Sequence, residues 1–384
     1  MKKIVFFLLI FLSFTGCATK KKIDNINVDF KFSEKINSFT ENVFTQIYVP
    51  EKNTAFSGTS VYNLLYLMSK ATAGESAAEI NKVLQLDDET FESVIPIFSS
   101  LENNTNSIWI DKNLSVKNSY SVFCKKLNSK IFSVNFADSK NVTKKINQFI
   151  KKSTKNEIPE FLKDDLSSAT KLCFLNTLYF NQKWEKPFPK DKTSKSDFYI
   201  SSDKTTSAKM MHNSDRYDYF EDDDFQIIQF DYKNSDYSMI CILPKTDDYD
   251  FSALPLCKLL SKFDEEKFNT SVQVSFPKFN SDVSTSLKEV LINLGIKNIF
   301  SYSADFSNIC DNSENIFVDE ILHETKVTVD EKKTKAVAVT LSMVKSAGPL
   351  SRYFFNCNHP FCYIIKDNSN NLILFTGVVN NPNE

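Results

Sequence analysis

The stretch EKKTKAVAVTLSMVKSAGPLSR, residues 331–352, joins the pattern of a strand to that of a loop. Ser, Gly and Pro in its second half are typical of an exposed loop. In its first half β-branched residues alternate with small ones, which is typical of a strand. One face of that strand carries only uncharged side chains of small or medium size: Thr334, Ala336, Ala338, Thr340, Ser342 and Val344. We therefore predict an exposed segment that can also pack as a buried strand, with Lys335 and Lys345 on its solvent face.

The composition indicates one large globular domain. The chain has 384 residues, of which 42% are hydrophobic, and its formal net charge is −2. Such a balance creates no strong field for a polyanion, so we predict no nucleic-acid partner. The lysine cluster at 144–152 is interpreted as the solvated face of a helix.

The N-terminus is typical of an exported protein. Two lysines precede an apolar run from Ile4 to Phe14, which is too short to span a membrane, and Thr15-Gly16-Cys17 follows. This resembles a bacterial lipobox and predicts a signal peptide over 1–16, a lipidated Cys17 and a polar tether over 17–29. Because Phe14 is unusual for a lipobox, ordinary cleavage with a free Cys17 remains the alternative. We expect a lipoprotein at the cell envelope or a secreted, extracellular protein.

Several classes of enzyme have no support in the sequence. The six glycines are too dispersed for a phosphate-binding loop or a GxSxG elbow. The three histidines are far apart and no HExxH occurs, so no metal or cofactor is expected. The seven cysteines after Cys17 form no CxxC, are odd in number and mostly lie in apolar runs, which is typical of small buried residues. We predict that the protein is not an enzyme.

Periodicity predicts an α+β domain. The first third is mainly helical, with a capping box of Ser76 and Glu79, and a later helix is predicted to begin at a second box, Ser286 with Glu289, and to end at Gly295. A strand is also expected at 315–322. Apolar and β-branched runs in the middle and at the end predict further strands at 172–180, 225–232, 237–244, 272–276, 360–365 and 372–379. No linker divides residues 30–384, so we expect a single domain with mostly antiparallel sheet.

Six blocks of sequence, in family order, resemble the serpins. The segment at 323–340 resembles the serpin hinge, and FNCNHPFCYII at 355–365 resembles the serpin signature. The other blocks are NTAFSGTS (53–60), LNTLYFNQKWEKPF (175–188), MMHNSDRYDYF with YSMICILP (210–220 and 237–244) and LGIKNIFSYSADFS (294–307). The resemblance implies the serpin fold: helices on a large central, mostly antiparallel sheet, two smaller sheets and an exposed reactive loop at about 331–352.

The implied function is that of a suicide-substrate inhibitor, which traps a serine endopeptidase as an acyl-enzyme when its cleaved loop inserts as a strand. The implied partner is therefore a protease, and the protein is expected to be a monomer. Two alternatives remain. The chain could be a non-inhibitory or substrate-like serpin that acts as a binding or scaffold protein, or it could inhibit trypsin-like or papain-like cysteine proteases.

The resemblance also assigns roles to residues. Ser57, Ser60, Asn176 and His323 match the polar cluster beneath the central sheet where its strands part, the shutter. Trp184 and Lys278 match the top of the sheet, the breach, where Lys278 would pair with the hinge residue Glu331. The hinge continues through Lys333, Thr334, Ala336, Ala338 and Thr340. Two departures stand out: Lys333 replaces the hinge glycine, which gives up backbone freedom, and Gly58 replaces a proline.

The family's spacing places the reactive bond. Counting sixteen residues from Glu331 gives Ala347-Gly348, and the small Ala347 suggests an elastase-like or subtilisin-like enzyme. Lys345-Ser346 is the alternative, which would suit a trypsin-like enzyme.

Overall fold

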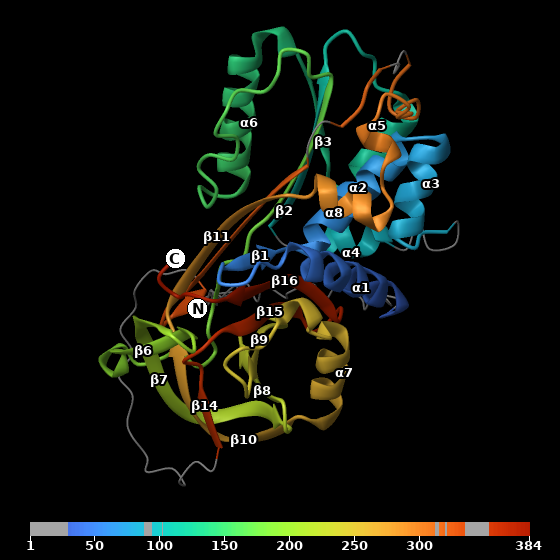
Figure 1. Cartoon of the computed structure of the whole chain (residues 1–384). Coiled ribbons are helices and arrows are strands. Elements are labelled where there is room, and N and C mark those ends of the chain that lie inside the picture. The colour runs from blue at the N-terminus through green and yellow to red at the C-terminus, as the bar shows by residue number, and fades with distance from the viewer. Residues whose placement is uncertain (1–29, 88–93, 102, 312–314, 319–320, 335–352) are drawn as a thin grey trace, which may run out of the picture.

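A computed structural model describes residues 30–87, 94–101, 103–311, 315–318, 321–334 and 353–384 (Figure 1). The predicted signal peptide, Cys17 and the tether lie outside these residues. So do residues 335–352 of the predicted reactive loop.

Helices occupy much of the first half of the chain, and strands dominate the second. The helices are α1 (Phe30–Ile47), α2 (Gly58–Ala71), α3 (Gly74–Val83), α4 (Val94–Ser100), α5 (Asn118–Lys126), α6 (Ser139–Ser153), α7 (Leu256–Glu266) and α8 (Lys288–Leu294). The strands are β1 (Thr54–Phe56), β2 (Asn104–Asp111), β3 (Lys130–Val134), β4 (Leu172–Leu178), β5 (Gln182–Lys183), β6 (Ser194–Ser201), β7 (Lys204–Glu221), β8 (Phe225–Asp231), β9 (Tyr237–Pro244), β10 (Phe268–Pro277), β11 (Phe279–Ser286), β12 (Leu322–Val329), β13 (Lys333–Thr334), β14 (Tyr353–Asn356), β15 (Phe361–Asp367) and β16 (Leu372–Val379). The predicted α+β class is confirmed.

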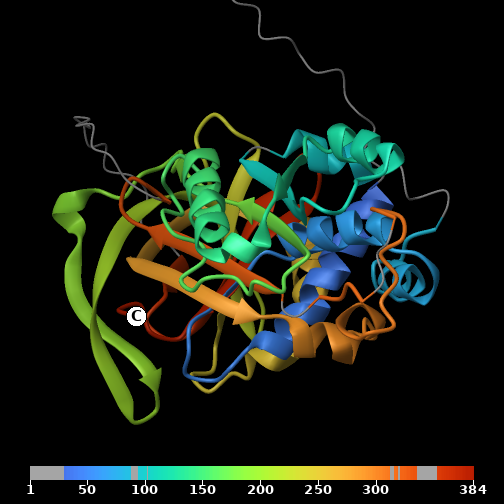
Figure 2. The ribbon, with the colours of Figure 1, turned by 90° about the horizontal axis from the view of Figure 1, so that it is seen from above.

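The described strands form one large sheet and two smaller ones. The largest runs β1-β16-β15-β9-β8-β7-β10-β14, with β6 paired to β7. The other two run β11-β12-β13-β5 and β3-β2-β4. The described strands pair antiparallel except for β2 with β3 and β10 with β14. Figure 2 shows the long β6–β7 hairpin at one edge of the molecule.

Helices cover both faces of the β3-β2-β4 sheet (Figure 1). On one face α6 buries Val142, Ile146 and Ile150 against Trp109 of β2 and Leu175 of β4. These α6 residues recur at helical spacing, which produces one apolar stripe while the lysines face solvent. On the other face lies α2, which is almost entirely buried.

The two smaller sheets are linked by the consecutive strands β4 and β5. Only residues 179–181 separate β4 from β5, yet β4 pairs with β2 while β5 pairs with β13. Within the described residues β12 pairs with β11 and β13, and it belongs to a different sheet from β4. These two sheets form one layer, and below β13 this layer is divided, because β4 and β12 do not pair with each other.

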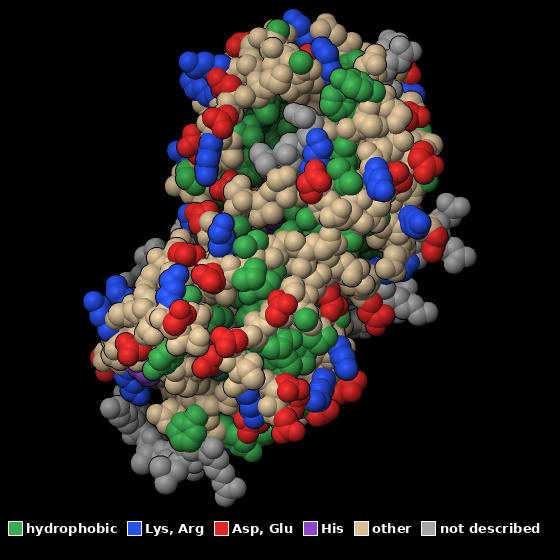
Figure 3. Space-filling model, viewed as in Figure 1, with side chains coloured by type: hydrophobic (Ala, Val, Ile, Leu, Met, Phe, Trp, Pro, Cys, Tyr) green, Lys and Arg blue, Asp and Glu red, His purple; other side chains and the backbone are tan. Residues whose placement is uncertain are grey.

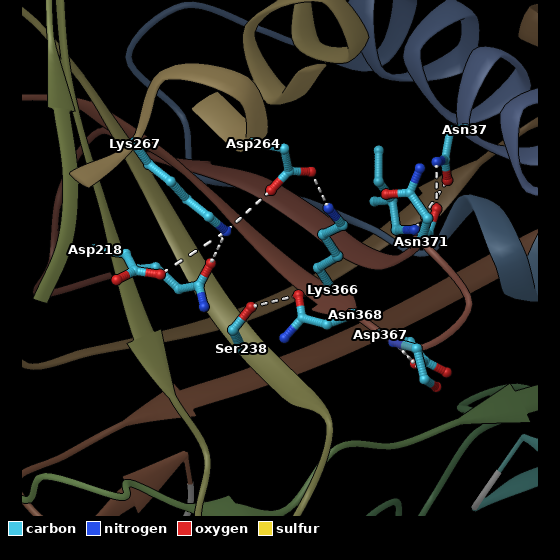
Figure 4. A network of polar contacts seen from close by, with 12 residues as sticks. Asn37, Asp218, Ser238, Asp264, Lys267, Lys366, Asp367, Asn368 and Asn371 are labelled. Atoms are coloured by element: carbon cyan, nitrogen blue, oxygen red, sulfur yellow. Dashed lines mark hydrogen bonds and ion pairs between the residues drawn. The ribbon is translucent and has the colours of Figure 1, made fainter. Parts of the chain in front are cut away.

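A network of charged side chains fixes α7 to the large sheet (Figure 4). Lys366 on β15 is 4% exposed, and its ammonium lies 2.5 Å from Asp264 of α7. Lys267, just after α7, also reaches Asp264 at 3.1 Å, and it lies 3.9 Å from Asp218 of β7. Because Lys366 is buried, loss of Asp264 would leave its charge uncompensated, so this pair stabilises the packing of α7 on β15.

Some local predictions are wrong. Ser76 and Glu79 do not cap α3, which begins at Gly74; Ser76 instead donates to Asn298, and Glu79 accepts from two backbone N–H groups of the 297–298 turn. Ser286 belongs to β11, and α8 has no side-chain cap. The strand predicted at 315–322 begins only at Leu322. In the first of these boxes tertiary partners compete successfully for the polar groups. Gly295 ends α8 as predicted, with φ of 110°.

The seven cysteines after Cys17 all have free thiols, and five of them are buried. Burial raises the pKa of the Cys173 and Cys362 thiols to about 12, because it disfavours the thiolate. They serve as small apolar residues, as predicted. None of the described helices combines the length and the apolar character needed to cross a bilayer.

Candidate functional site: the gap between β4 and β12

The four residues of the predicted shutter lie together at the divided part of the sheet layer. Ser57, at the N-cap of α2, donates its backbone N–H to Nε2 of His323 at 3.0 Å, and its hydroxyl to the carbonyl of Leu374 at 2.7 Å. One helical turn later the Ser60 hydroxyl donates to Asn176 on β4. These contacts tie the start of α2 to β4, to β12 and to β16 at once.

Further polar residues complete this shutter cluster. The amide of Asn176 donates to Asn104 at 2.8 Å and to Asn106 at 2.5 Å, both on the neighbouring strand β2. The hydroxyl of Thr325 lies 2.7 Å from Nε2 of His323. None of these three residues was predicted. The alternation of Asn104 with Asn106, and of His323 with Thr325, places each pair on one face of a strand and could have revealed them.

His323 is held in its neutral form. The imidazole is 7% exposed, it packs edge-on against Phe56 with ring centroids 5.2 Å apart, and its burial lowers the pKa to about 4. Because Nε2 accepts the N–H of Ser57, the ring proton belongs on Nδ1. Protonation of Nε2 would remove this acceptor and break the contact between α2 and β12.

A small cavity of about 10 Å³ marks the gap itself. It is lined by Phe174 and Asn176 of β4, by Ile321 just before β12, by His323 of β12 and by residues of α2. The space is about that of one water molecule. At this point β4 and β12 are therefore separated by a space of about one water molecule.

The predicted breach lies at the other end of β12, where Glu331 is fixed from three sides. Its carboxylate lies 2.8 Å from the Lys278 ammonium and accepts a hydrogen bond from Thr193 at 3.1 Å, and its carbonyl accepts the N–H of Phe188 at 2.8 Å. Burial alone would favour the neutral acid, but the hydrogen bonds from Lys278 and Thr193 hold the pKa of Glu331 below its usual range. Thr193 was not predicted, and it carries no signal in the sequence.

Trp184 secures the residues on both sides of Glu331. Its indole N–H donates to the carbonyl of Asp330 at 2.9 Å, and its backbone N–H donates to Lys332 at 3.1 Å. The ring is 3% exposed and stacks on Tyr232 with centroids 4.7 Å apart. The backbone on both sides of Glu331 is therefore held in place where the chain leaves the breach.

Directly after this point β13 begins a new strand between its neighbours. Thr334 pairs with Val329 of β12 on one side and with Gln182 of β5 on the other, and both pairings are antiparallel. Lys333, the residue that replaces the hinge glycine, pairs with Lys183. The chain of 333–334 therefore points down the gap that separates β4 from β12.

Gly58 is explained by a close approach of α1. A Cβ atom at this position would lie 1.9 Å from the hydroxyl of Thr40 and 2.8 Å from its Cα atom. The first turn of α2 can pack here only without a side chain.

The remaining predicted residues lie outside the described part of the chain. These are the hinge residues Ala336, Ala338 and Thr340, both candidate reactive bonds (Ala347-Gly348 and Lys345-Ser346), and Cys17. Across the described ranges no three His, Cys, Asp or Glu side chains come together in a way that could hold a metal ion.

Comparison with known proteins places this architecture. The family model for "Serpin (serine protease inhibitor)" matches residues 34–382. Serine proteinase inhibitor 1 of rabbitpox virus is 30% identical over 354 residues, covering 85% of this chain and 95% of its own. An uncharacterized serpin-like protein of Thermococcus kodakarensis is 28% identical, covering 91% and 85%. The crystal structure of human thyroxine-binding globulin with its ligand superposes with a TM-score of 0.82 at 24% identity, covering 92% of this chain and 99% of its own, which shows the shared fold. The chain belongs to the serpin family.

Proposed function

We propose that this serpin is a suicide-substrate inhibitor, which traps a serine endopeptidase when its cleaved loop inserts between β4 and β12. The observation that carries the proposal is β13. Thr334 already pairs with strands on both sides, and Lys333 pairs with β5, at the top of a gap that continues below them. A loop that is cut at its far end can extend this strand downward.

The two pairings of Thr334 fix where each later residue would lie. Each step forward from Thr334 moves one step back from Val329 on β12 and one step back from Gln182 on β5 and β4. Six steps bring Thr340 opposite His323 on one side and opposite Asn176 on the other. Two independent registers therefore lead one loop residue to the shutter cluster, and its strands would part to admit the loop.

The register also decides which loop residues would be buried. Ala336 and Ala338 come opposite Val327 and Thr325, which are 1% and 2% exposed. These positions require small uncharged side chains, and the loop supplies them. Lys335 comes opposite Thr328, on the more open face of β12. The solvent-facing lysines therefore present no obstacle to insertion.

The covalent step would occur at the far end of the loop. The enzyme's serine hydroxyl attacks the Ala347 carbonyl, the Ala347-Gly348 bond breaks, and the Gly348 amine leaves with a proton. The enzyme remains as an ester on Ala347. Ala347 lies thirteen positions after Thr334, so full insertion would carry the enzyme about 43 Å at ~3.3 Å per residue. Small Ala347 favours elastase-like or subtilisin-like enzymes, while cleavage after Lys345 would favour trypsin-like ones.

Lys333 supports a second candidate, a substrate-like serpin. Glycine at this hinge would rotate freely as β13 extends, whereas Lys333 is more restricted. If insertion is slower than hydrolysis of the ester, the enzyme escapes and the serpin is only cleaved. The inserting face of the loop carries only uncharged side chains of small or medium size, and this favours the inhibitor.

We also propose export, with Cys17 as a lipidated first residue that attaches the protein to a membrane. This rests on the N-terminal sequence alone. Incorporation of labelled palmitate into the expressed full chain tests it, with Cys17→Ser as the control that must lose the label.

Incubation with elastase, subtilisin, trypsin and papain tests the function. A band that survives SDS and equals the summed masses identifies the trapped enzyme. Cleavage without such a band selects the substrate-like serpin. Mass spectrometry of the released C-terminal fragment then locates the bond: a start at Gly348 supports Ala347, and a start at Ser346 supports Lys345.

A further inference from the structure

The lysines of the chain are unevenly distributed. Residues 112–155 contain eleven lysines and a single acidic residue, Asp138, which gives this segment a formal charge of +10. Because the whole chain carries −2, the remaining residues together carry −12. The nearly neutral total therefore conceals two regions of opposite charge. An asymmetry of this kind indicates a surface that attracts an anionic partner.

Five of the eleven lysines lie on the outer face of α6. They are exposed, on the side opposite the apolar stripe that packs against β2 and β4: Lys140, Lys144, Lys145, Lys151 and Lys152. Their spacing of four or seven residues places them along one broad face of the helix. Among the described residues none of these five forms an ion pair. Their charges are therefore available to a partner outside the chain.

β3 and α5 extend this charged face. Lys130, at the start of β3, lies over the Phe149 ring of α6 with its ammonium 5.4 Å from the centroid. Lys125 and Lys126 end α5, and both are exposed. We name these three lysines, with the five of α6, the basic surface. The segment 157–171 adds four acidic residues and two lysines, which lowers the excess charge to +8 without removing it. Figure 3 shows Lys or Arg side chains at the upper left of the molecule, where α6 lies in Figure 1.

The basic surface lies far from the strand that follows the predicted reactive loop. In Figure 1 α5 and α6 occupy the upper end of the molecule, whereas β14 lies at the lower end, next to β10. A flat partner that covers the basic surface therefore leaves β14 uncovered, and an enzyme can still approach the chain there.

The start of α1 is connected to the upper end of the molecule through α3. Tyr62 contacts the ring of Phe32, in the first turn of α1, with centroids 5.9 Å apart, and it donates its hydroxyl to the carbonyl of the residue that caps the end of α3. α3 has ten residues and is therefore about 15 Å long. At its start the segment 305–309 accepts the backbone N–H groups of Ala73 and of Lys117, which precedes α5. Little more than the length of α3 therefore separates the start of α1 from that of α5.

We propose that the basic surface docks on the anionic headgroups of the membrane to which the lipid on Cys17 attaches the protein. The thirteen residues from Cys17 to Asp29 reach at most about 44 Å, which allows this end of the molecule to face the membrane. Each lysine close to an anionic membrane strengthens binding about five-fold. Docking would direct β14 and the loop away from the membrane, toward approaching enzymes. The choice of partner rests on the proposed lipidation, whereas the basic surface itself does not.

Trapping of an enzyme would compete with docking. The start of β4 lies at the same end as α6, because Leu172 pairs with Ile110, and the next residue of β2, Asp111, pairs with Val134 shortly before α6. Full insertion of the loop would carry the enzyme toward the start of β4, and therefore toward the basic surface. The trapped complex is expected to bind an anionic membrane more weakly than the intact serpin. This consequence alone rests on the proposed inhibitor function.

Co-sedimentation with vesicles tests docking without the lipid. The proposed exported chain, residues 17–384 with Cys17→Ser, is mixed with vesicles rich in phosphatidylglycerol or with vesicles of phosphatidylcholine alone. Binding is expected only to the anionic vesicles, and it is expected to weaken as salt is added, because salt screens the attraction. Replacing Lys151 and Lys152 together by glutamine, which keeps a good helix former at both positions, is expected to weaken binding about twenty-five-fold.

Replacing Lys190 and Lys192 together by glutamine is the matched control. Both lysines are exposed and lie in a turn just before β6, outside the basic surface, so the same loss of charge is expected to leave binding unchanged. Thermal melting of both double variants checks that the fold is retained.

The lipidated full chain provides a second measurement. A membrane-impermeant acetylating reagent is expected to modify the five lysines of α6 more slowly on phosphatidylglycerol vesicles than on phosphatidylcholine vesicles. Lys190 and Lys192 are expected to react equally on both. Mass spectrometry of the peptides reports each position.

Each outcome bears on the proposal. Equal binding to the two kinds of vesicle, or an equal loss of binding in the two double variants, would overturn it. Binding to a DNA duplex without binding to anionic vesicles would also overturn it and assign the basic surface to a soluble polyanion. If palmitate is not incorporated, the proposed lipidation fails while the vesicle measurements still decide docking. If no enzyme is trapped, the inhibitor function fails and docking is judged from the intact protein.

Discussion

Replacing Thr340 by arginine tests the register that β13 sets. In that register Thr340 would enter the gap between Asn176 and His323, at a cavity of about 10 Å³. The residues that line this cavity include no carboxylate. The guanidinium would therefore be buried without an opposite charge.

The magnitude follows from two opposing free energies. Inserting residues 335–344 would form on the order of ten hydrogen bonds, worth about 5–15 kcal/mol in total. An uncompensated buried charge costs several kcal/mol. With a cost of about 4 kcal/mol in the transition state, insertion slows about a thousand-fold. Insertion can still be favourable overall, but hydrolysis of the ester is then expected to finish first.

The assay measures the ratio of trapped to cleaved serpin on a denaturing gel. Thr340→Arg is expected to be cleaved at the wild-type rate and to trap almost no enzyme. Val339→Arg is the matched control, because the same register places Val339 on the opposite face, next to Glu324, so the trapped fraction is expected to stay at the wild-type value. Equal trapping by the two variants would refute the register.

Three further predictions concern the hinge, the shutter cluster and α2. Lys333→Gly is expected to raise the trapped fraction, since it restores backbone freedom at the hinge; a fall in this fraction would contradict the assignment. Because the native pKa of His323 is about 4 and the unperturbed value is 6.5, the native state resists protonation, so its stability is complete above about pH 6.5 and decreases as the pH falls toward 4. The loss attributable to His323 is at most about 3 kcal/mol, and His323→Gln is expected to flatten the pH dependence of the unfolding rate. Gly58→Ala places a methyl group against Thr40 and is expected to lower the free energy of unfolding by about 1–3 kcal/mol. An unchanged thermal midpoint would show that α1 can move to accommodate the methyl group.

Much of the fold could be predicted because the signals are local or belong to the family pattern. The stripe of α6, the end of α8 at Gly295 and the strands at 225–231 and 237–244 all follow from periodicity and turn chemistry. The polar pairs Ser76–Glu79 and Ser286–Glu289 matched a local motif equally well and failed. The groups of the first pair form other contacts in the folded chain, and Ser286 belongs to the strand β11.

The candidate site could be predicted only where a residue belongs to a recognisable block. The meeting of Ser57, Asn176 and His323 depends on three elements that are distant in sequence, and the family pattern supplied this information. Thr193 reaches Glu331 across 138 positions of the chain, and no pattern in the sequence indicates it. The division of the sheet layer between β4 and β12 is likewise a property of the native state rather than of either strand, since both have the composition of ordinary paired strands.

We propose that cleavage turns the loop into a strand between β4 and β12. Amide hydrogen exchange of the intact protein and of protein cut at Ala347 measures this directly, in peptides that cover 172–178, 322–329 and 334–344. We expect exchange to slow in all three segments after the cut, because inserted residues and their new neighbours become hydrogen-bonded. Unchanged exchange in β4 and β12, with 334–344 exchanging as an exposed chain, would contradict it.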